Sequence, residues 1–120
     1  MKILLAITLL FVQLQIFAQK CPTASLLDKT EFKQQIENKR IQLVDVRTKA
    51  EFETSHIKGA MNADVLKEEK FKNQFAEYNK EEPVYIYCRS GNRSQKASQL
   101  LCELGFKKIY DLKGGYLTWE

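Results

Sequence analysis

The sequence predicts a single α/β domain with a small, mainly parallel β-sheet flanked by helices. Short, nearly continuous apolar segments at residues 41–46 and 84–87 are typical of parallel strands that are buried on both faces. Stretches with helical spacing of apolar residues separate and follow them, and strands that alternate with helices indicate this fold class. A chain of 120 residues without an internal repeat or a low-complexity tract has room for one core.

The N-terminus has the pattern of a secretory signal peptide, which we place at residues 1–18. Lys2 precedes an apolar run at residues 3–12, which is shorter than the roughly 20 residues that span a bilayer. Cleavage after the small residue Ala18 would leave a mature domain at residues 19–120. We therefore expect a periplasmic or otherwise exported protein, and an uncleaved membrane anchor is the alternative.

The first half of the domain is expected to contain a helix, a strand and a helical turn. Asp28 and Glu31 form a capping-box pattern, and two apolar residues then repeat at helical spacing, which predicts a helix to about Asn38. Residues 41–46 are the first expected strand. A short helical turn at residues 50–52 follows.

The second half continues this alternation of helices and strands. Helical spacing predicts a helix at residues 66–78, then the strand at 84–87 and a further helix with a buried face over residues 97–104. Residues 108–112 form the last expected strand, after which Gly114-Gly115 turns the chain. The apolar stripe of the first of these helices consists of Leu66, Phe71, Phe75 and Tyr78.

Cys88 lies where an expected strand passes into the N-terminus of a helix. The unpaired N–H groups of a first helical turn and the positive end of the helix dipole both favour an anion. Arg89 and Arg93 add positive charge on either side. Such surroundings favour the thiolate, which is the nucleophilic form of cysteine, so the sequence predicts a reactive thiol rather than an inert core thiol.

The loop from Cys88 to Arg93 is small enough to select its substrate. Residues 89–92 separate the two, and Ser, Gly and Asn at 90–92 allow backbone N–H groups to curl around a sulfur as an anion-binding nest. Cysteine phosphatases with a similar loop carry one residue more, since a tetrahedral phosphate needs that room. Tyr87 stands where those phosphatases usually carry His. The loop therefore favours sulfur chemistry over a phosphatase or an arsenate reductase.

Three segments in this order together resemble one known family. Residues 43–47, Leu-Val-Asp-Val-Arg, with Glu-Phe at 51–52 and His-Ile-Lys-Gly-Ala at 56–60 are similar to its first signature. The Cys88 loop follows, and residues 114–119, Gly-Gly-Tyr-Leu-Thr-Trp, are similar to its closing signature. The chain resembles the single-domain rhodanese-like sulfurtransferases over nearly all of its mature length. The resemblance implies the rhodanese-like fold.

The resemblance also implies a catalytic role for Cys88. It would attack the outer sulfur of a donor, hold that sulfur as a persulfide and pass it to an acceptor. Arg89 would guide an anionic donor, whereas Arg93 would either close the loop or tie it to a carboxylate or to carbonyl groups. The backbone N–H groups of the active-site loop would come from Ser90, Gly91, Asn92 and Ser94.

Other polar residues are expected to support this loop rather than to react. Asp45 and Arg47 lie at a strand end near the site, where a buried ion pair or a loop-bracing carboxylate is favoured over a catalytic role. His56 resembles the structural histidine of the family rather than a general base. Trp119 is expected to pack over the core.

Cys21 and Cys102 are the other two cysteines of the chain. An odd number in an exported protein indicates one pair and one free thiol, and Cys102 lies off the buried face of its helix. A Cys21–Cys102 disulfide and two unconnected thiols are both compatible with the sequence. Lipidation of Cys21 is not expected, because Lys20 stands where lipoproteins carry a small residue.

The function expected from these features is that of an exported thiosulfate sulfurtransferase. Its partners would be a small anionic donor, thiosulfate or a persulfide, and a cyanide or thiol acceptor. We expect no cofactor or metal, because one His and three scattered Cys offer no ligand spacing. A net charge of +4 spread among Lys and Glu does not indicate nucleic acid. We expect a monomer without stable membrane insertion once the signal is cleaved. The alternative is a slow or non-catalytic sulfur-carrier or partner-docking module.

Overall fold

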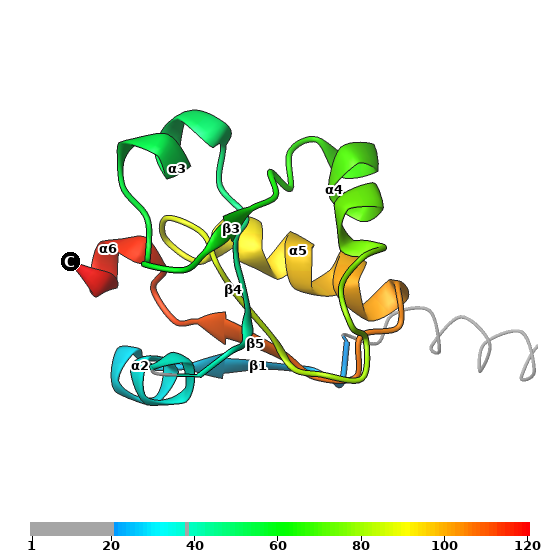
Figure 1. The fold of residues 1–120 in the computed structure, drawn as a ribbon, viewed down its shortest axis with the longest axis horizontal. Coiled ribbons are helices and arrows are strands. Elements are labelled where there is room, and N and C mark those ends of the chain that lie inside the picture. The colour runs from blue at the N-terminus through cyan, green and yellow to red at the C-terminus, as the bar shows by residue number, and fades with distance from the viewer. Residues whose placement is uncertain (1–20, 38) are drawn as a thin grey trace, which may run out of the picture.

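Five strands, all paired in parallel, form one sheet in the order β1-β5-β4-β2-β3 in the computed structural model, which describes residues 21–37 and 39–120 (Figure 1). The strands are β1 (Ala24–Leu27), β2 (Gln42–Asp45), β3 (Met61–Asn62), β4 (Val84–Tyr87) and β5 (Ile109–Leu112). The helices are α2 (Lys29–Ile36), α3 (Lys49–Thr54), α4 (Glu68–Phe75), α5 (Asn92–Glu103) and α6 (Tyr116–Trp119). The chain therefore has the α/β class that its sequence predicts, with a small parallel sheet flanked by helices.

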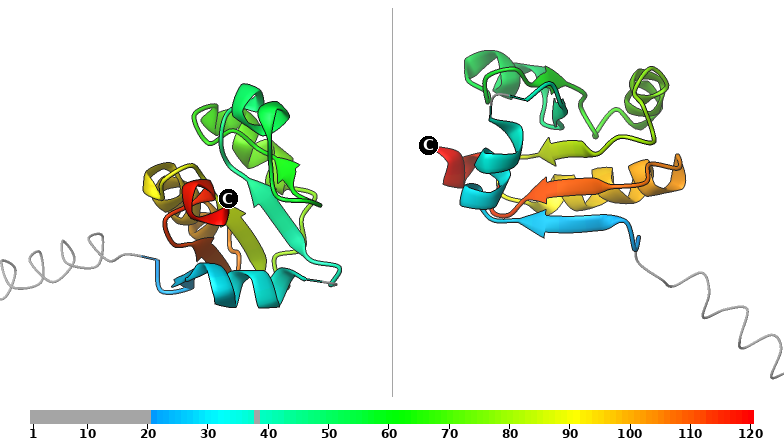
Figure 2. Two further views of the ribbon diagram at one scale, coloured as in Figure 1. Left: turned by 90° about the vertical axis from the view of Figure 1, so that its left-hand side faces the viewer. Right: turned by 60° about the horizontal axis from the view of Figure 1, so that its bottom comes forward.

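The sheet separates two apolar clusters, because successive side chains of a strand point to opposite faces. Val84 and Ile86 of β4 pack into a cluster with α4 and α5, whereas Tyr85 and Tyr87 pack into a second cluster with α2. Two views of the ribbon show α5 and α2 on opposite sides of the sheet (Figure 2). All four of these β4 residues are buried, as expected for a central parallel strand.

The strand at Val84–Tyr87 has the predicted bounds. The first helix, the helix expected at residues 66–78 and the strands expected at 41–46 and 108–112 are shorter than predicted, whereas the helical turn expected at 50–52 is longer. The first helix ends at Ile36, and Asp28 caps it by accepting the N–H of Glu31 at 2.8 Å. The helix expected over residues 66–78 covers Glu68–Phe75. Leu66 was expected on its buried stripe but lies before the helix and is 66% exposed, so that expectation is wrong.

Three elements were not predicted from the sequence. Strand β3 has two residues, which is too short for a period-2 pattern to be recognised. Strand β1 lies at the sheet edge and is only partly buried, and α6 is a single turn after Gly115. Short elements of this kind form because their neighbours hold them in place rather than because of local sequence preference.

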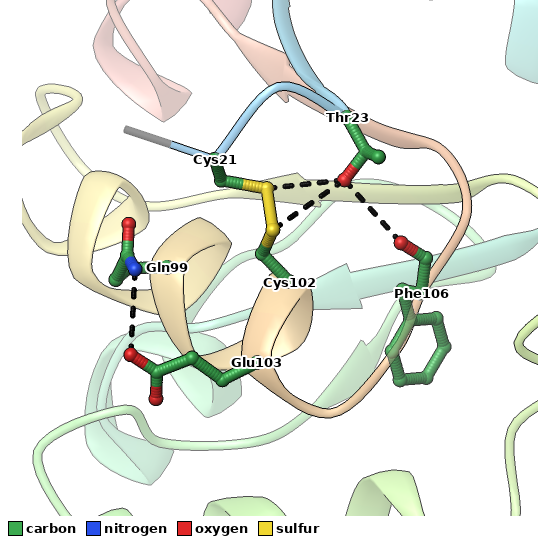
Figure 3. The surroundings of a disulfide bond; sticks show 6 residues. All are labelled: Cys21, Thr23, Gln99, Cys102, Glu103 and Phe106. Atoms are coloured by element: carbon green, nitrogen blue, oxygen red, sulfur yellow. Dashed lines mark hydrogen bonds between the residues drawn. A yellow bond between two sulfur atoms is a disulfide. The ribbon is translucent and has the colours of Figure 1, made fainter. Parts of the chain in front are cut away.

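A disulfide joins Cys21, just before β1, to Cys102 in α5, with their Cα atoms 5.9 Å apart (Figure 3). The Thr23 hydroxyl lies beside both sulfurs and donates a hydrogen bond to the carbonyl oxygen of Phe106 at 3.3 Å. Of the two possibilities that the sequence left open, the structure contains the paired one. Cys88 is the free cysteine.

The proposed signal peptide at residues 1–18 and its cleavage site lie outside the described residues. Within residues 21–37 and 39–120, no helix has the length and apolar character needed to cross a membrane.

Candidate active site

Cys88 follows the last residue of the central strand β4, and α5 begins four residues later at Asn92. Gly91 makes this tight passage possible, because its φ of 104° belongs to the left-handed region that glycine adopts easily. Cys88 points to the same face of the sheet as Ile86 and is only 1% exposed. The thiol therefore lies at the N-terminal end of α5, as predicted, but in a closed position.

Two groups of the loop contact the sulfur. The Gly91 N–H donates to Cys88 Sγ at 3.0 Å, and the Ser94 hydroxyl oxygen lies 3.4 Å from it. Ser94 thus contributes its side chain rather than the expected backbone N–H. In the part of the chain that the structure describes, Gly91 is the one of the four expected residues whose backbone N–H donates to the resting sulfur.

The glycine pair Gly114-Gly115, which was expected to turn the chain, leads into a turn whose N–H groups bind the backbone of the Cys88 loop. The N–H groups of Tyr116 and Leu117 donate to the carbonyl oxygens of Cys88 and Arg89 at 2.8 and 3.1 Å. A Cβ atom on Gly115 would lie 2.5 Å from both of those oxygens. The absence of a side chain at Gly115 therefore lets α6 approach the backbone of the active-site loop closely.

Arg93 does not point toward the sulfur as a donor to substrate. Its guanidinium forms two hydrogen bonds with the Glu51 carboxylate, at 2.6 and 2.9 Å. Glu51 also forms a capping box with Thr48 at the start of α3. The bonds from Arg93, followed by those from Thr48, lower the pKa of Glu51 to about 2. Of the two expected roles for Arg93, the structure thus shows the one in which a carboxylate holds the loop.

Arg89, Ser90 and Asn92 remain exposed around the loop. The guanidinium of Arg89 is consequently available to solvent, in contrast to that of Arg93. A positive charge at such a position attracts small anions without fixing their orientation.

Asp45 and Arg47 form the expected buried ion pair, with a closest distance of 2.7 Å. Arg47 also donates to the Ser55 carbonyl oxygen at 2.7 Å, and its guanidinium lies 4.4 Å from the centre of the Tyr116 ring. These contacts join β2, the end of α3 and α6 on the sheet face opposite to α5. The pair therefore braces the elements around the loop and does not contact the sulfur.

Tyr87 and His56 are likewise engaged in structural contacts. The hydroxyl oxygen of Tyr87 accepts the N–H of Ile57 at 3.0 Å, and burial raises the pKa of this tyrosine. His56 is exposed, stacks on Phe52 with ring centres 3.8 Å apart, and places Nδ1 2.8 Å from the Phe52 carbonyl oxygen. Trp119, expected over the core, is half-buried and packs edge-on against Phe32.

Asp111 also lies at the site, although no sequence pattern predicted it there. It lies in β5, is 3% exposed, and its Oδ2 accepts a hydrogen bond from the Ser94 hydroxyl at 2.9 Å. Burial raises the pKa of Asp111 to about 7, although the bond from Ser94 opposes this shift. The available signal was a carboxylate in a strand whose neighbours Ile109 and Leu112 are apolar. Among the described residues, no group of three His, Cys, Asp or Glu is placed to hold a metal ion.

Comparisons with known proteins show the family to which the chain is similar. The model of the rhodanese-like domain matches residues 28–120. The thiosulfate sulfurtransferase GlpE of Shewanella oneidensis is 36% identical over 94 residues, which cover 78% of this chain and 90% of that protein. The Bacillus subtilis protein YqhL is 42% identical over 81 residues, which cover 68% of this chain and 62% of YqhL.

The fold is also similar to solved structures. A rhodanese-like domain protein from Staphylococcus aureus superposes with a TM-score of 0.70 and 29% identity, covering 80% of this chain and 91% of that one. The matching segments include the strand, the Cys88 loop and the glycine pair described above, since the domain match extends from residue 28 to residue 120. The chain therefore belongs to the rhodanese-like sulfurtransferase family.

Proposed function

We propose that this protein is a thiosulfate-type sulfurtransferase in which Cys88 carries the transferred sulfur as a persulfide. The observation that carries the proposal is the placement of the Cys88 sulfur at the N-terminus of α5, with the Gly91 N–H directed at it from 3.0 Å. A helix N-terminus and a directed N–H both stabilise a sulfur anion. The names of relatives such as GlpE support this choice of reaction.

The proposed reaction has two steps. The Cys88 thiolate attacks the outer sulfur of thiosulfate, so that a new S–S bond forms while the donor S–S bond breaks and its electron pair leaves with sulfite. Cyanide or a thiolate then attacks the outer sulfur of the persulfide, and Cys88 departs as the thiolate. Each step is a thiol–disulfide type of exchange, and each leaving group is a stable anion that needs no general acid.

The loop residues have distinct roles in this proposal. Arg89, which is exposed, increases the local concentration of an anionic donor. Arg93 acts indirectly, because its bonds to Glu51 hold the start of α5 against α3. The loop N–H groups stabilise the negative charge on the outer sulfur of the persulfide.

Mass spectrometry of the intact protein tests the sulfur-carrier step. Incubation with thiosulfate should add the mass of one sulfur atom to the wild type, and cyanide should remove it. Cys88→Ser should show no gain, while Cys102→Ser, which keeps Cys88, should gain the same mass. Equal behaviour of wild type and Cys88→Ser would contradict the proposal.

Steady-state kinetics separate an enzyme from a slow docking module. The 1% exposure of Cys88 favours the slower alternative, since a small donor reaches the sulfur only when the loop admits it. Turnover of thiosulfate and cyanide well above that of Cys88→Ser supports the enzyme. Persulfide formation without such turnover supports a carrier that delivers sulfur to a docked partner.

We further propose that the protein is exported to the periplasm after removal of residues 1–18. The charged start and apolar run of the N-terminus support this location. Expression with the native leader, fractionation and intact-mass measurement should give a periplasmic chain that begins at Gln19. A full-length chain in the cytoplasmic fraction would contradict export.

A further inference from the structure

A chain of three buried polar side chains leads from the sulfur into the interior of the domain. Cys88 Sγ lies 3.4 Å from Ser94 Oγ, and Ser94 Oγ lies 2.9 Å from Asp111 Oδ2. The three residues are 1%, 0% and 3% exposed. Because water has so little access to the thiol, its proton needs an acceptor within the protein before the thiolate can form.

The Ser94 hydroxyl has one proton to donate, so the protonation states of its two neighbours, Cys88 and Asp111, depend on each other. When Asp111 is ionised, Ser94 donates to the carboxylate, and Cys88 can only offer its own S–H to the Ser94 oxygen. When Asp111 carries a proton, it donates to Ser94, whose hydroxyl is then free to donate to a Cys88 thiolate. The Ser94 hydroxyl also lies 3.2 Å from the Gly91 carbonyl oxygen, an alternative acceptor.

We propose that Asp111 receives the thiol proton of Cys88 through Ser94. The S–H bond of Cys88 breaks as a new O–H bond forms on Ser94, while the original Ser94 proton passes to Asp111 Oδ2. The thiol and carboxylate become a thiolate and a carboxylic acid, so one negative charge moves from Asp111 to the sulfur. Asp111 is a positioning residue, since it acts on the sulfur only through Ser94.

The surroundings of Asp111 suit a group that exchanges a proton near neutral pH. Its Oδ1 is buried and makes no hydrogen bond with the described residues. Burial raises the pKa of Asp111 to about 7, so the carboxyl can hold a proton under physiological conditions. An isolated buried carboxylate is costly, which favours transfer of the negative charge to a sulfur that the α5 N-terminus stabilises.

The elements packed against Asp111 bring few charges to it. Asp111 lines a cavity together with uncharged residues of β1 and α5, and its register partners are Ile86 of β4 and Leu26 of β1. The charged residues of this part of α5 are engaged elsewhere, Arg93 with Glu51 and Lys96 with Glu68. The other residues that line this cavity are all uncharged: Cys21, Ala24, Ser25, Leu26, Gln95, Ser98 and Gln99.

The proposed proton route requires an exit from Asp111 to solvent. Asp111 lines a surface cavity of about 410 Å³, together with polar residues of β1 and α5 such as Ser25 and Gln95. In the proposed route, a proton held on Asp111 leaves on the side of this cavity rather than through the closed active-site loop. The chain of hydrogen bonds thus leads from the buried sulfur toward the cavity between β1 and α5.

Thiolate absorbance near 240 nm, taken as the difference between each protein and its Cys88→Ser counterpart, tests the proposal over pH 4–10. Two groups that share a proton titrate in two macroscopic steps. The wild type should therefore show two steps, and Asp111→Asn should show one. Ser94→Ala should also show one step although Asp111 is present, whereas Ser94→Thr, which retains a hydroxyl, should restore two. Curves that coincide in all four proteins would overturn the proposal.

Carbon-13 NMR of the Asp111 carboxyl group provides a second test that avoids substitution of Asp111. The titration midpoint should move by about one pH unit or more, a roughly tenfold change in proton affinity, between wild type and Cys88→Ser. The shift should be lost in the Ser94→Ala background. An unchanged midpoint in Cys88→Ser, or a shift that persists without the Ser94 hydroxyl, would overturn the proposed route.

This inference rests on the proposed role of Cys88 as the nucleophile, but its test uses no sulfur donor. If the titrations of Cys88 and Asp111 are independent while the persulfide forms normally, only the proposed proton route is contradicted. If the two titrations are coupled but no persulfide forms, only the proposed sulfur transfer is contradicted. The two proposals therefore fail separately.

Discussion

Asp111 is a carboxyl group in the interior of the domain, where ionisation costs stability. Its Oδ2 accepts one hydrogen bond from Ser94, and its Oδ1 makes none with the described residues. Groups that lower stability in this way are often found where function requires them. The cost can be measured because it depends on pH.

We expect the stability contribution of Asp111 to fall as the pH rises from about 4 to above 7. Its pKa is raised from 3.8 to about 7 by burial, so the folded state binds the proton more tightly than the unfolded state does. The contribution is full below pH 4 and lost as the pH rises through 7. A shift of this size corresponds to at most ~4 kcal/mol. Urea unfolding at pH 5 and pH 8 should show a smaller decrease for Asp111→Asn than for the wild type.

Asp28→Asn is the matched control for this measurement. Asp28 is exposed and caps α2, a position in which Asn also serves well. This variant should follow the wild-type pH dependence between pH 5 and pH 8. If Asp111→Asn follows it as well, the buried carboxyl does not titrate in the folded protein near neutral pH.

Helix α3 shows how an element with little core contact is held in place. It has six residues, none of them buried, so packing alone contributes little to its stability. The Glu51 carboxylate joins Thr48 at its N-terminus to Arg93 of α5. A short surface helix is thereby connected to the helix that begins at the active-site loop.

Removal of this carboxylate should lower stability at neutral pH and have no effect in strong acid. The bonds from Arg93 lower the pKa of Glu51 from 4.5 to about 2, so its contribution is present above pH 4.5 and lost as the pH falls through 2. Glu51→Gln should lower the free energy of unfolding by about 1 kcal/mol at pH 7. Urea unfolding at pH 7, 4 and 2 should show this difference shrinking in the most acidic sample.

Glu53→Gln in the same helix is the control for charge removal. Glu53 pairs with Lys49 at 3.8 Å, with side chains 63% and 81% exposed, and such pairs contribute little. This substitution should leave the urea midpoint at pH 7 nearly unchanged. Equal losses in the two variants would show that the Arg93 contact has no special contribution.

At the scale of the whole molecule, the disulfide connects the edge of the sheet to its covering helix. Cys21 precedes the edge strand β1, and Cys102 lies 81 residues later in α5. A covalent link over such a separation restricts the unfolded chain strongly. It also fixes the strand that contributes one wall of the cavity beside Asp111.

Loss of this link should destabilise the domain without preventing sulfur loading. We expect the double variant Cys21→Ser/Cys102→Ser to lose ~2–4 kcal/mol in urea unfolding, because the unfolded state regains conformational freedom. Its gain of one sulfur atom from thiosulfate should persist, since Cys88 is retained. A reductant should lower the wild-type urea midpoint and leave that of the variant unchanged. A wild-type midpoint that does not respond to reductant would contradict the contribution of the disulfide.

Patterns within a few consecutive residues were enough to predict the central strand, the helix after it, the position of Cys88 and the family. The apolar run at 84–87, the helix that follows it and the position of Cys88 between them could be read from the sequence, because burial of adjacent side chains sets these elements. The family signatures at 43–47 and 114–119 then indicated the fold and the reaction class. The ion pair of Asp45 with Arg47 could also be predicted from the sequence, because its two partners are only two residues apart.

Only the tertiary structure decided the partners that lie far apart in the chain. Arg93 is 42 residues from Glu51, Ser94 is 17 from Asp111, and Cys21 is 81 from Cys102. Local sequence patterns do not indicate how far apart such residues lie in space. The way the helices α3 and α5 pack relative to the sheet that contains β5 brings them together. The same packing gave Ser94 its role, because the Asp111 carboxylate of β5, 17 residues away in the chain, accepts the hydrogen bond of its hydroxyl.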